Sequence, residues 1–121
     1  MVLNVFTDGA SRGNPGKAGI GVAIYRDKEL ILELHEYVGI RTNNEAEYLA
    51  LIKALQKIKE LNELTANIFS DSEFLVKQMK KEYKVKAEKI VPLNQMAVNL
   101  LAGLDVKFHW VPREDNLKAD E

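Results

Sequence analysis

The sequence predicts a single α/β domain built on a mixed five-stranded sheet that is flanked by helices. Three short β-rich segments come first, and segments with helical periodicity then alternate with two further β-rich segments. The 121 residues, 46% of them hydrophobic, are enough to bury about two thirds of the unfolded surface around one core. We therefore expect one domain over residues 1–121, with three antiparallel strands extended by two parallel strands through helical crossovers.

The three antiparallel strands are expected at residues 2–7, 19–26 and 30–35. Five of the seven glycines lie between Gly9 and Gly21, which predicts a glycine-rich turn between the first two strands. The polar pair Asp27-Lys28 predicts the next turn. The alternation of apolar and polar residues that follows it indicates a third strand with one face more exposed to solvent.

A capping box predicts where the first long helix begins. Thr42 is the expected N-cap, and Glu45 can reach back to it from three residues further on. Apolar residues then repeat at helical spacing as far as Leu61. The remaining elements are expected to be a strand at residues 65–70, helices at 72–81 and 92–102, a strand at 106–110, and a last helix that is cut short at residue 121.

The composition excludes several classes of protein and of site. The chain has no cysteine, which rules out a disulfide scaffold, a thiolate zinc site and a cysteine nucleophile. Its formal net charge is −1, so a polyanionic partner would need a local basic patch. No apolar run approaches the roughly 20 residues that span a bilayer, and no signal peptide is recognisable. We expect a cytoplasmic monomer without a membrane partner.

Three acidic residues are predicted to meet at one edge of the sheet. Asp8 and Asp71 follow the first and fourth predicted strands, and parallel neighbours of this kind lie about 4.8 Å apart. Glu47 stands at the start of the core-facing stripe of the first long helix and points toward the same edge. Carboxylates about 5 Å apart would repel by about 3 kcal/mol per pair at an effective dielectric of 20. Such a cluster needs protons or a hard cation such as Mg²⁺ or Mn²⁺.

Each acid also has a simpler structural explanation. Asp8-Gly9 is a common turn dipeptide, Asp71 could cap the helix that follows it, and Glu47 could be a partly exposed helix residue. Taken singly, these explanations are at least as good as a functional one. The coincidence of three acids at one predicted edge favours a shared site.

Four separated motifs carry a resemblance to a known family. They are Phe6-Thr7-Asp8-Gly9-Ala10-Ser11 with Gly13-Asn14-Pro15-Gly16, Thr42-Asn43-Asn44-Glu45-Ala46-Glu47, Ser70-Asp71-Ser72, and Trp110-Val111-Pro112 through Asn116 to Ala119-Asp120-Glu121. In these motifs and in their order, over essentially its whole length, the chain resembles type 1 ribonuclease H. The resemblance implies the ribonuclease H-like five-stranded mixed sheet. It also implies metal-dependent cleavage of the RNA strand in RNA–DNA hybrids, with 5′-phosphate and 3′-hydroxyl ends.

The resemblance also implies roles for individual residues. Its four metal-binding acids fall on Asp8, Glu47, Asp71 and Asp120, the last of which only the resemblance singles out. Asp8 would bridge two ions, with Asp71 and Glu47 on one ion and Asp120 on the other. Substrate contacts are implied for Gly9, Ser11, Asn14, Thr42, Asn43 and Asn44. Amides, hydroxyls and bare main chain suit recognition of the RNA 2′-hydroxyl, although Thr42 is also explained as a cap and Gly9 as a turn residue.

The chain departs from the family pattern in two places. The loop before the last helix often carries a histidine in the family, but here it reads Pro112-Arg113-Glu114-Asp115. We expect His35 and His109 to be surface or packed residues rather than substitutes for it. The chain also ends one residue after Asp120, whereas relatives continue the helix, so that acid is expected to be less firmly held.

A lysine-rich segment is the expected site for phosphates of the DNA strand. Residues 77–89 contain six lysines and two glutamates, a local charge of +4. The lysines are Lys77, Lys80, Lys81, Lys84, Lys86 and Lys89. A solvated helix and loop face explains the same pattern equally well. Three functions therefore stay open beside one another: a hybrid nuclease; a nuclease of the same fold that acts on double-stranded RNA or accompanies a reverse transcriptase; and a non-catalytic hybrid-binding module.

Overall fold

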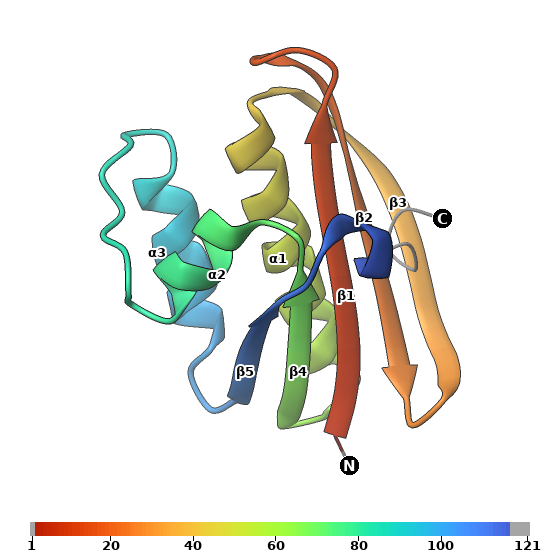
Figure 1. Ribbon diagram of the computed structural model, residues 1–121. Coiled ribbons are helices and arrows are strands. Elements are labelled where there is room, and N and C mark those ends of the chain that lie inside the picture. The colour runs from red at the N-terminus through yellow and green to blue at the C-terminus, as the bar shows by residue number, and fades with distance from the viewer. Residues whose placement is uncertain (1, 117–121) are drawn as a thin grey trace.

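The computed structural model describes residues 2–116 and confirms the predicted fold class (Figure 1). In chain order the elements are β1 (Val2–Ser11), β2 (Gly16–Arg26), β3 (Glu29–Arg41), α1 (Asn43–Glu60), β4 (Thr65–Ser70), α2 (Glu73–Met79), α3 (Val91–Leu100), β5 (Asp105–Trp110) and the short 3-10 helix η1 (Arg113–Asn116). The predicted last helix and Asp120 lie outside the described residues.

The strands form one mixed sheet in the order β3-β2-β1-β4-β5. Strand β2 pairs antiparallel with both β1 and β3, whereas β4 runs parallel to both β1 and β5. This is the predicted combination of a three-stranded meander with two parallel strands. The central strand β1 therefore has neighbours on both sides, one from each half of the chain.

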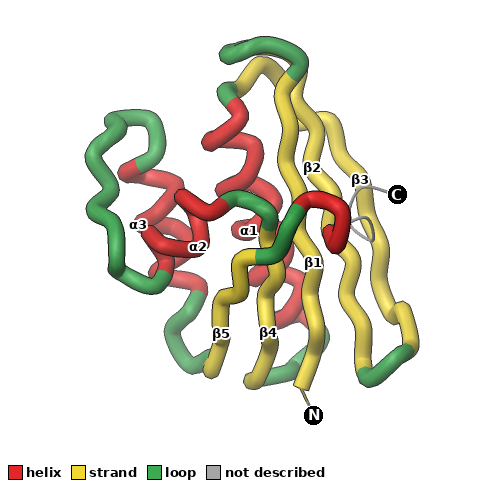
Figure 2. The backbone as a smooth tube through the Cα atoms, viewed as in Figure 1, coloured by secondary structure: helices red, strands yellow, loops and turns green. Residues whose placement is uncertain are grey.

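The three α-helices cover one face of the sheet, and η1 lies on the other (Figures 1 and 2). Alternate residues of β1 are buried on the helical face, where Leu3 and Val5 pack into one core with the α1 residues Leu51 and Leu55. Burial of such side chains contributes roughly 1.5–3 kcal/mol each. The alternate residues of β1 that point to the helical face thus hold the helices against the sheet.

The opposite face carries a row of stacked rings across three strands. The rings of Phe6 and Phe69 lie 4.9 Å apart, and His109 stacks on Phe69 at the same distance. The Nε2 atom of His109 also lies 3.0 Å from Oδ1 of Asn67. His109 is therefore a packed residue, as expected.

The predicted glycine-rich turn is wrong in its extent, because β1 and β2 both run further than expected. Residues 12–15 alone connect the two strands, and Gly9, Gly19 and Gly21 lie inside strands. A Cβ atom on Gly9 would overlap the main chain of Ala46 in α1. Gly9 is thus explained by close packing of a helix on a strand and not by a turn.

Other boundaries differ from the prediction by a few residues. Strand β3 extends from Glu29 to Arg41, well beyond the predicted residues 30–35, because it pairs with β2 along most of its length. Helix α2 ends at Met79 and not at residue 81, and Lys81 adopts a positive φ of 66° just after it. Among residues 2–116, no helix is both long and apolar enough to cross a membrane.

Candidate active site

The candidate site lies where β4 ends beside β1. The two strands pair from Val2 with Thr65 to Thr7 with Ser70, after which β4 stops and β1 continues. Asp8 and Asp71 are each the first residue beyond the last pair, and so they stand side by side. Asp8 was predicted to close its strand; it lies inside β1 instead, because β2 still pairs with it through Gly21.

Helix α1 brings the third acid to the same place. The predicted capping box is present: the Thr42 hydroxyl accepts from the Glu45 N–H at 3.2 Å, and the Glu45 carboxylate accepts from the Thr42 N–H at 2.9 Å. Glu47 lies one turn into the helix, where its Oε1 atom accepts a 2.7 Å hydrogen bond from the main-chain N–H of Gly9. This hydrogen bond therefore holds the Glu47 carboxylate against the part of β1 that continues beyond the end of β4.

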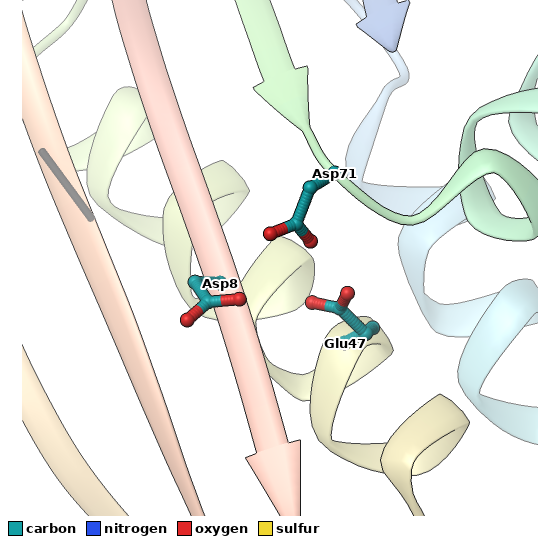
Figure 3. A group of neighbouring side chains, drawn as sticks. All are labelled: Asp8, Glu47 and Asp71. Atoms are coloured by element: carbon teal, nitrogen blue, oxygen red, sulfur yellow. The ribbon is translucent and has the colours of Figure 1, made fainter. Parts of the chain in front are cut away.

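The three carboxylates point toward one another (Figure 3). One oxygen from each of Asp8, Glu47 and Asp71 lies within 4.8 Å of the others. Burial, followed by the negative charges of Asp71 and Asp8, raises the pKa of Glu47 to about 9. In the absence of a cation, Glu47 thus keeps its proton at neutral pH, which relieves the repulsion within the cluster.

The donor set fits a divalent cation. Two oxygens bound to one Mg²⁺ at about 2.1 Å lie at most about 4.2 Å apart, so the observed cluster needs little closure to share an ion. The Oδ2 atom of Asp71 is buried, and no donor from residues 2–116 reaches it. A buried carboxylate oxygen without a hydrogen bond is costly unless a cation or a proton compensates it. Oxygen ligands alone favour hard cations.

The simpler explanation of Asp71 as a helix cap is wrong. Ser72 caps α2, because its hydroxyl accepts from the Leu75 N–H at 3.3 Å. The main chain of Asp71 is held from β5 instead, where the Trp110 indole Nε1–H donates to the Asp71 carbonyl at 3.3 Å. The carboxylate of Asp71 thus has no capping role, and its position beside Asp8 follows from the sheet.

The polar residues implied as substrate contacts gather around the N-terminus of α1 and the loop of residues 12–15. The Oδ1 atom of Asn43 accepts from the Ser11 N–H at 2.8 Å, and that of Asn14 accepts from the Asn43 N–H at 3.2 Å. These bonds fix both amide oxygens against the main chain and leave the NH₂ groups to donate elsewhere. Asn44 is exposed next to them, and it lines a groove together with Glu47.

The lysine-rich segment is divided between different surroundings. Lys84 and Lys86 line a groove of about 290 Å³ that also contains Glu47 and the exposed ring of Phe74. Lys77 is engaged with Glu73 at 3.2 Å and with the Tyr83 hydroxyl at 3.3 Å. Lys80 lines a separate groove beside β5. Of the predicted phosphate-binding lysines Lys77, Lys80, Lys81 and Lys84, only Lys84 lines the groove next to the acids.

The sequence did not predict the contacts that two residues make near the acids. Asn116 is completely buried, and its Nδ2 atom donates to the Thr7 carbonyl at 2.8 Å, which ties η1 to β1 beside Asp8. Trp110 holds the main chain of Asp71, as described above. Both residues belong to the last motif, but their contacts depend on where β5 and η1 lie. No local pattern reveals them.

Comparison with known proteins gives one consistent family. A family model described as RNase H matches residues 1–121. The bifunctional protein Rv2228c of Mycobacterium tuberculosis is 37% identical over 123 residues, which cover 99% of this chain and 34% of that protein. Ribonuclease HI of Halobacterium salinarum is 34% identical over 120 residues, which cover 98% of this chain and 60% of that protein. The chain thus spans about a third of the mycobacterial relative.

Solved structures agree with these matches. The N-terminal RNase H domain of the M. tuberculosis protein superposes with a TM-score of 0.95 at 35% identity, covering 99% of this chain and 94% of that one. LC11-RNase H1, isolated from compost by a metagenomic approach, has been solved in complex with an RNA/DNA hybrid. That structure superposes with a TM-score of 0.84 at 37% identity, covering 98% of this chain and 91% of that one.

Proposed function

Because this chain belongs to the ribonuclease H family, we propose that it is an endonuclease that hydrolyses the RNA strand of RNA–DNA hybrids and leaves 5′-phosphate and 3′-hydroxyl ends. The observation that carries this proposal is the convergence of Asp8, Glu47 and Asp71 on one point. The solved hybrid complex of a relative 37% identical supports the same class of substrate. We further propose that residues 1–121 act as one domain and as a monomer.

The acids act by holding divalent ions at the scissile phosphate. Asp8 would bridge two ions, while Glu47 and Asp71, whose carboxylates face it across the cluster, would complete one of the two sites. Bound Mg²⁺, or Mn²⁺ in its place, would activate the attacking water and stabilise the leaving oxygen. Within the chain, the Gly9 N–H orients the carboxylate of Glu47, and Trp110 holds the main chain of Asp71.

Asp120 is the proposed fourth ligand, on the second ion. Asn116 is tied to Thr7, the residue before Asp8. Asp120 is the fourth residue after Asn116, and four residues span at most about 14 Å. This span is long enough for a ligand at position 120 to reach the cluster, which is why we propose Asp120 as that ligand.

Recognition of the RNA strand is assigned to the polar residues around the N-terminus of α1. The amide NH₂ groups of Asn14, Asn43 and Asn44 can donate to base edges and 2′-hydroxyls in a minor groove. Gly9, Ser11 and Thr42 complete this proposed contact set. The 2′-hydroxyl is the group that distinguishes RNA from DNA, so these contacts would select the strand to be cut.

The groove lined by Lys84 and Lys86 is the proposed path of the DNA strand. Its cations can neutralise phosphates, and the exposed ring of Phe74 can pack against a sugar. It adjoins Glu47, so a strand in this groove would lie next to the strand that is cut. Lys77 is left out of this path because it is engaged with Glu73, and Lys80 is left out because it lines the separate groove beside β5.

Cleavage of matched duplexes tests the proposed function. Purified protein is incubated with labelled RNA–DNA hybrid, RNA–RNA and DNA–DNA duplexes of one sequence, with and without Mg²⁺. We expect Mg²⁺-dependent cleavage of the RNA strand of the hybrid only. Comparable cleavage of RNA–RNA would support the double-stranded RNA nuclease instead. Salt-sensitive binding of hybrid without any products would support the non-catalytic module.

A further inference from the structure

One buried hydroxyl group joins the three helices. Tyr48 of α1 is only 2% exposed, and its hydroxyl donates a 2.7 Å hydrogen bond to Oε1 of Gln78 in α2. The same hydroxyl accepts a 3.2 Å hydrogen bond from Nδ2 of Asn94 in α3. The hydroxyl therefore uses its donor and one of its acceptor sites, and each bond links α1 to a different helix.

The two bonds lie at the two ends of the lysine-rich loop. Gln78 is the last residue but one of α2, and Asn94 is the fourth residue of α3. Residues 80–90 connect these two helices, and they carry the two lysines that line the groove next to the acids (Figure 1). The Tyr48 hydroxyl thus closes the base of this loop, because it holds both helices that the loop joins.

The other contacts that hold this loop are local or apolar. Within the described part of the chain, the hydrogen bonds of residues 84–89 stay inside the loop and the start of α3. Val85 packs against the core, and Ile90 is buried where the loop ends. Apolar contacts of this kind have no preferred direction, whereas hydrogen bonds do. The bonds of Tyr48 therefore determine where the loop stands relative to α1.

The same bonds lie in the wall of the groove next to the acids. Residues of α1, of α2 and of the loop line this groove, and Tyr48, Gln78 and Lys84 are among them. Tyr48 directly follows Glu47 in α1, and α2 begins two residues after Asp71. A bond between α1 and α2 at this point therefore fixes the separation between the acids and the lysines across the groove.

We propose that Tyr48 is a positioning residue: its two hydrogen bonds hold the loop so that Lys84 and Lys86 stand at a fixed distance from the acid cluster. The inference rests on the proposed nuclease function and adds to it a buried residue that acts through others. With the lysines so placed, they neutralise phosphates of the uncut strand while the other strand lies at the acids. Tyr48 serves binding and not the chemical step, because its hydroxyl is bonded to α2 and α3 and not to the acids.

Tyr48→Phe removes the hydroxyl and keeps the ring, so the core stays filled. We expect the dissociation constant for hybrid, measured without Mg²⁺ by fluorescence anisotropy, to rise about fivefold, with kcat within twofold of wild type. Asn94→Ala removes only the bond to α3 and should shift the dissociation constant in the same direction by less. Ile58→Val, which removes one buried methylene group at the far end of α1, is the control for lost stability and should change neither constant.

Removal of the lysines decides whether Tyr48 acts through them. In a protein that carries Lys84→Ala and Lys86→Ala, we expect Tyr48→Phe to change the dissociation constant by less than twofold, because the groups that it positions are gone. An unchanged dissociation constant in Tyr48→Phe, an equal fold-change with and without the lysines, or a fall in kcat alone would overturn the inference. A wild type that binds hybrid without cutting it would refute the nuclease function, and the comparison of dissociation constants would still decide the role of Tyr48.

Discussion

The main-chain N–H of Gly9 donates a 2.7 Å hydrogen bond to the carboxylate of Glu47, and so joins the central strand to the helix that packs on it. This bond forms because β4 ends at Ser70 and no longer pairs with β1. It requires glycine at position 9, since α1 lies directly against the strand there. The acid cluster is thus built by the same packing that places α1 on the sheet.

Gly9→Ala should therefore damage both the fold and the site. The added methyl group overlaps the main chain of Ala46 and Glu47, and overpacking against rigid main chain costs roughly 1–3 kcal/mol or more. We expect the free energy of unfolding, measured by urea denaturation, to fall by about 3 kcal/mol. Gly19→Ala is the control and should cost less than about 1 kcal/mol, because its Cβ has room. Equal stability of the two variants would refute this account of Gly9.

Neutralising an acid of the cluster should separate stability from activity. Without metal, Asp8→Asn or Asp71→Asn relieves repulsion, so the free energy of unfolding should be unchanged or higher. Hybrid cleavage should fall by at least about 100-fold, because a ligand has been removed. Asp27→Asn, in the turn before β3 at a φ of 58° that asparagine tolerates, should change neither property. Loss of stability together with retained cleavage would contradict the assignment.

The raised pKa of Glu47 gives the metal-free protein a characteristic pH dependence. Between the ordinary value of 4.5 and the folded value of about 9, the native state holds a proton that the unfolded state has lost. The contribution of Glu47 to stability is therefore complete below pH 4.5 and is lost as the pH rises toward 9. We expect wild type to lose stability over this range relative to Glu47→Gln, in chemical denaturation with a chelator present. Parallel stability curves for the two proteins would disprove the shift.

Asn116 should matter to both stability and cleavage. Asn116→Ala removes a buried hydrogen bond and leaves the Thr7 carbonyl without that donor, which costs roughly 1–3 kcal/mol. It also releases the tether before Asp120, so cleavage should fall more than about tenfold at a temperature where the variant is folded. Asn99→Ala on the exposed side of α3 is the control. A stable but fully active Asn116→Ala protein would show that η1 does not support the site.

The two groups of lysines should differ in their effect on binding. Lys84→Ala combined with Lys86→Ala should weaken hybrid binding and reduce the slope of log affinity against log salt by about 0.9 for each phosphate that is no longer neutralised. Lys80→Ala should leave the slope unchanged, because Lys80 lines a different groove. Binding is measured by fluorescence anisotropy at several salt concentrations. The same slope in wild type and in both variants would place the DNA strand elsewhere.

Local patterns in the sequence predicted much of this architecture. The capping box at Thr42 predicted where α1 begins. The helical period counted from that start predicted that the side chain of Glu47 points toward the sheet. Alternation and helical spacing predicted the sheet and the order of its elements. The juxtaposition of Asp8 and Asp71 followed from the expectation that their strands are parallel neighbours, which they are.

Features that depend on long-range packing were not predictable in this way. The role of Gly9 depends on how closely α1 approaches β1, and Ser72 rather than Asp71 caps α2 because of how the chain leaves β4. The division of the lysines depends on the path of the loop after α2, where Lys81 turns the chain. Each of these features joins residues distant in sequence or depends on a single dihedral angle. Such features leave no periodic signal in the sequence.

Calorimetric titration of the metal-free protein with Mg²⁺ at pH 7 tests most directly whether the three carboxylates share a cation. Repeating it in two buffers of different ionisation enthalpy gives the number of protons released. We predict saturable binding with release of about one proton, which comes from Glu47, and loss of that proton in Glu47→Gln. Absence of saturable binding, or the same proton release in Glu47→Gln, would contradict the account.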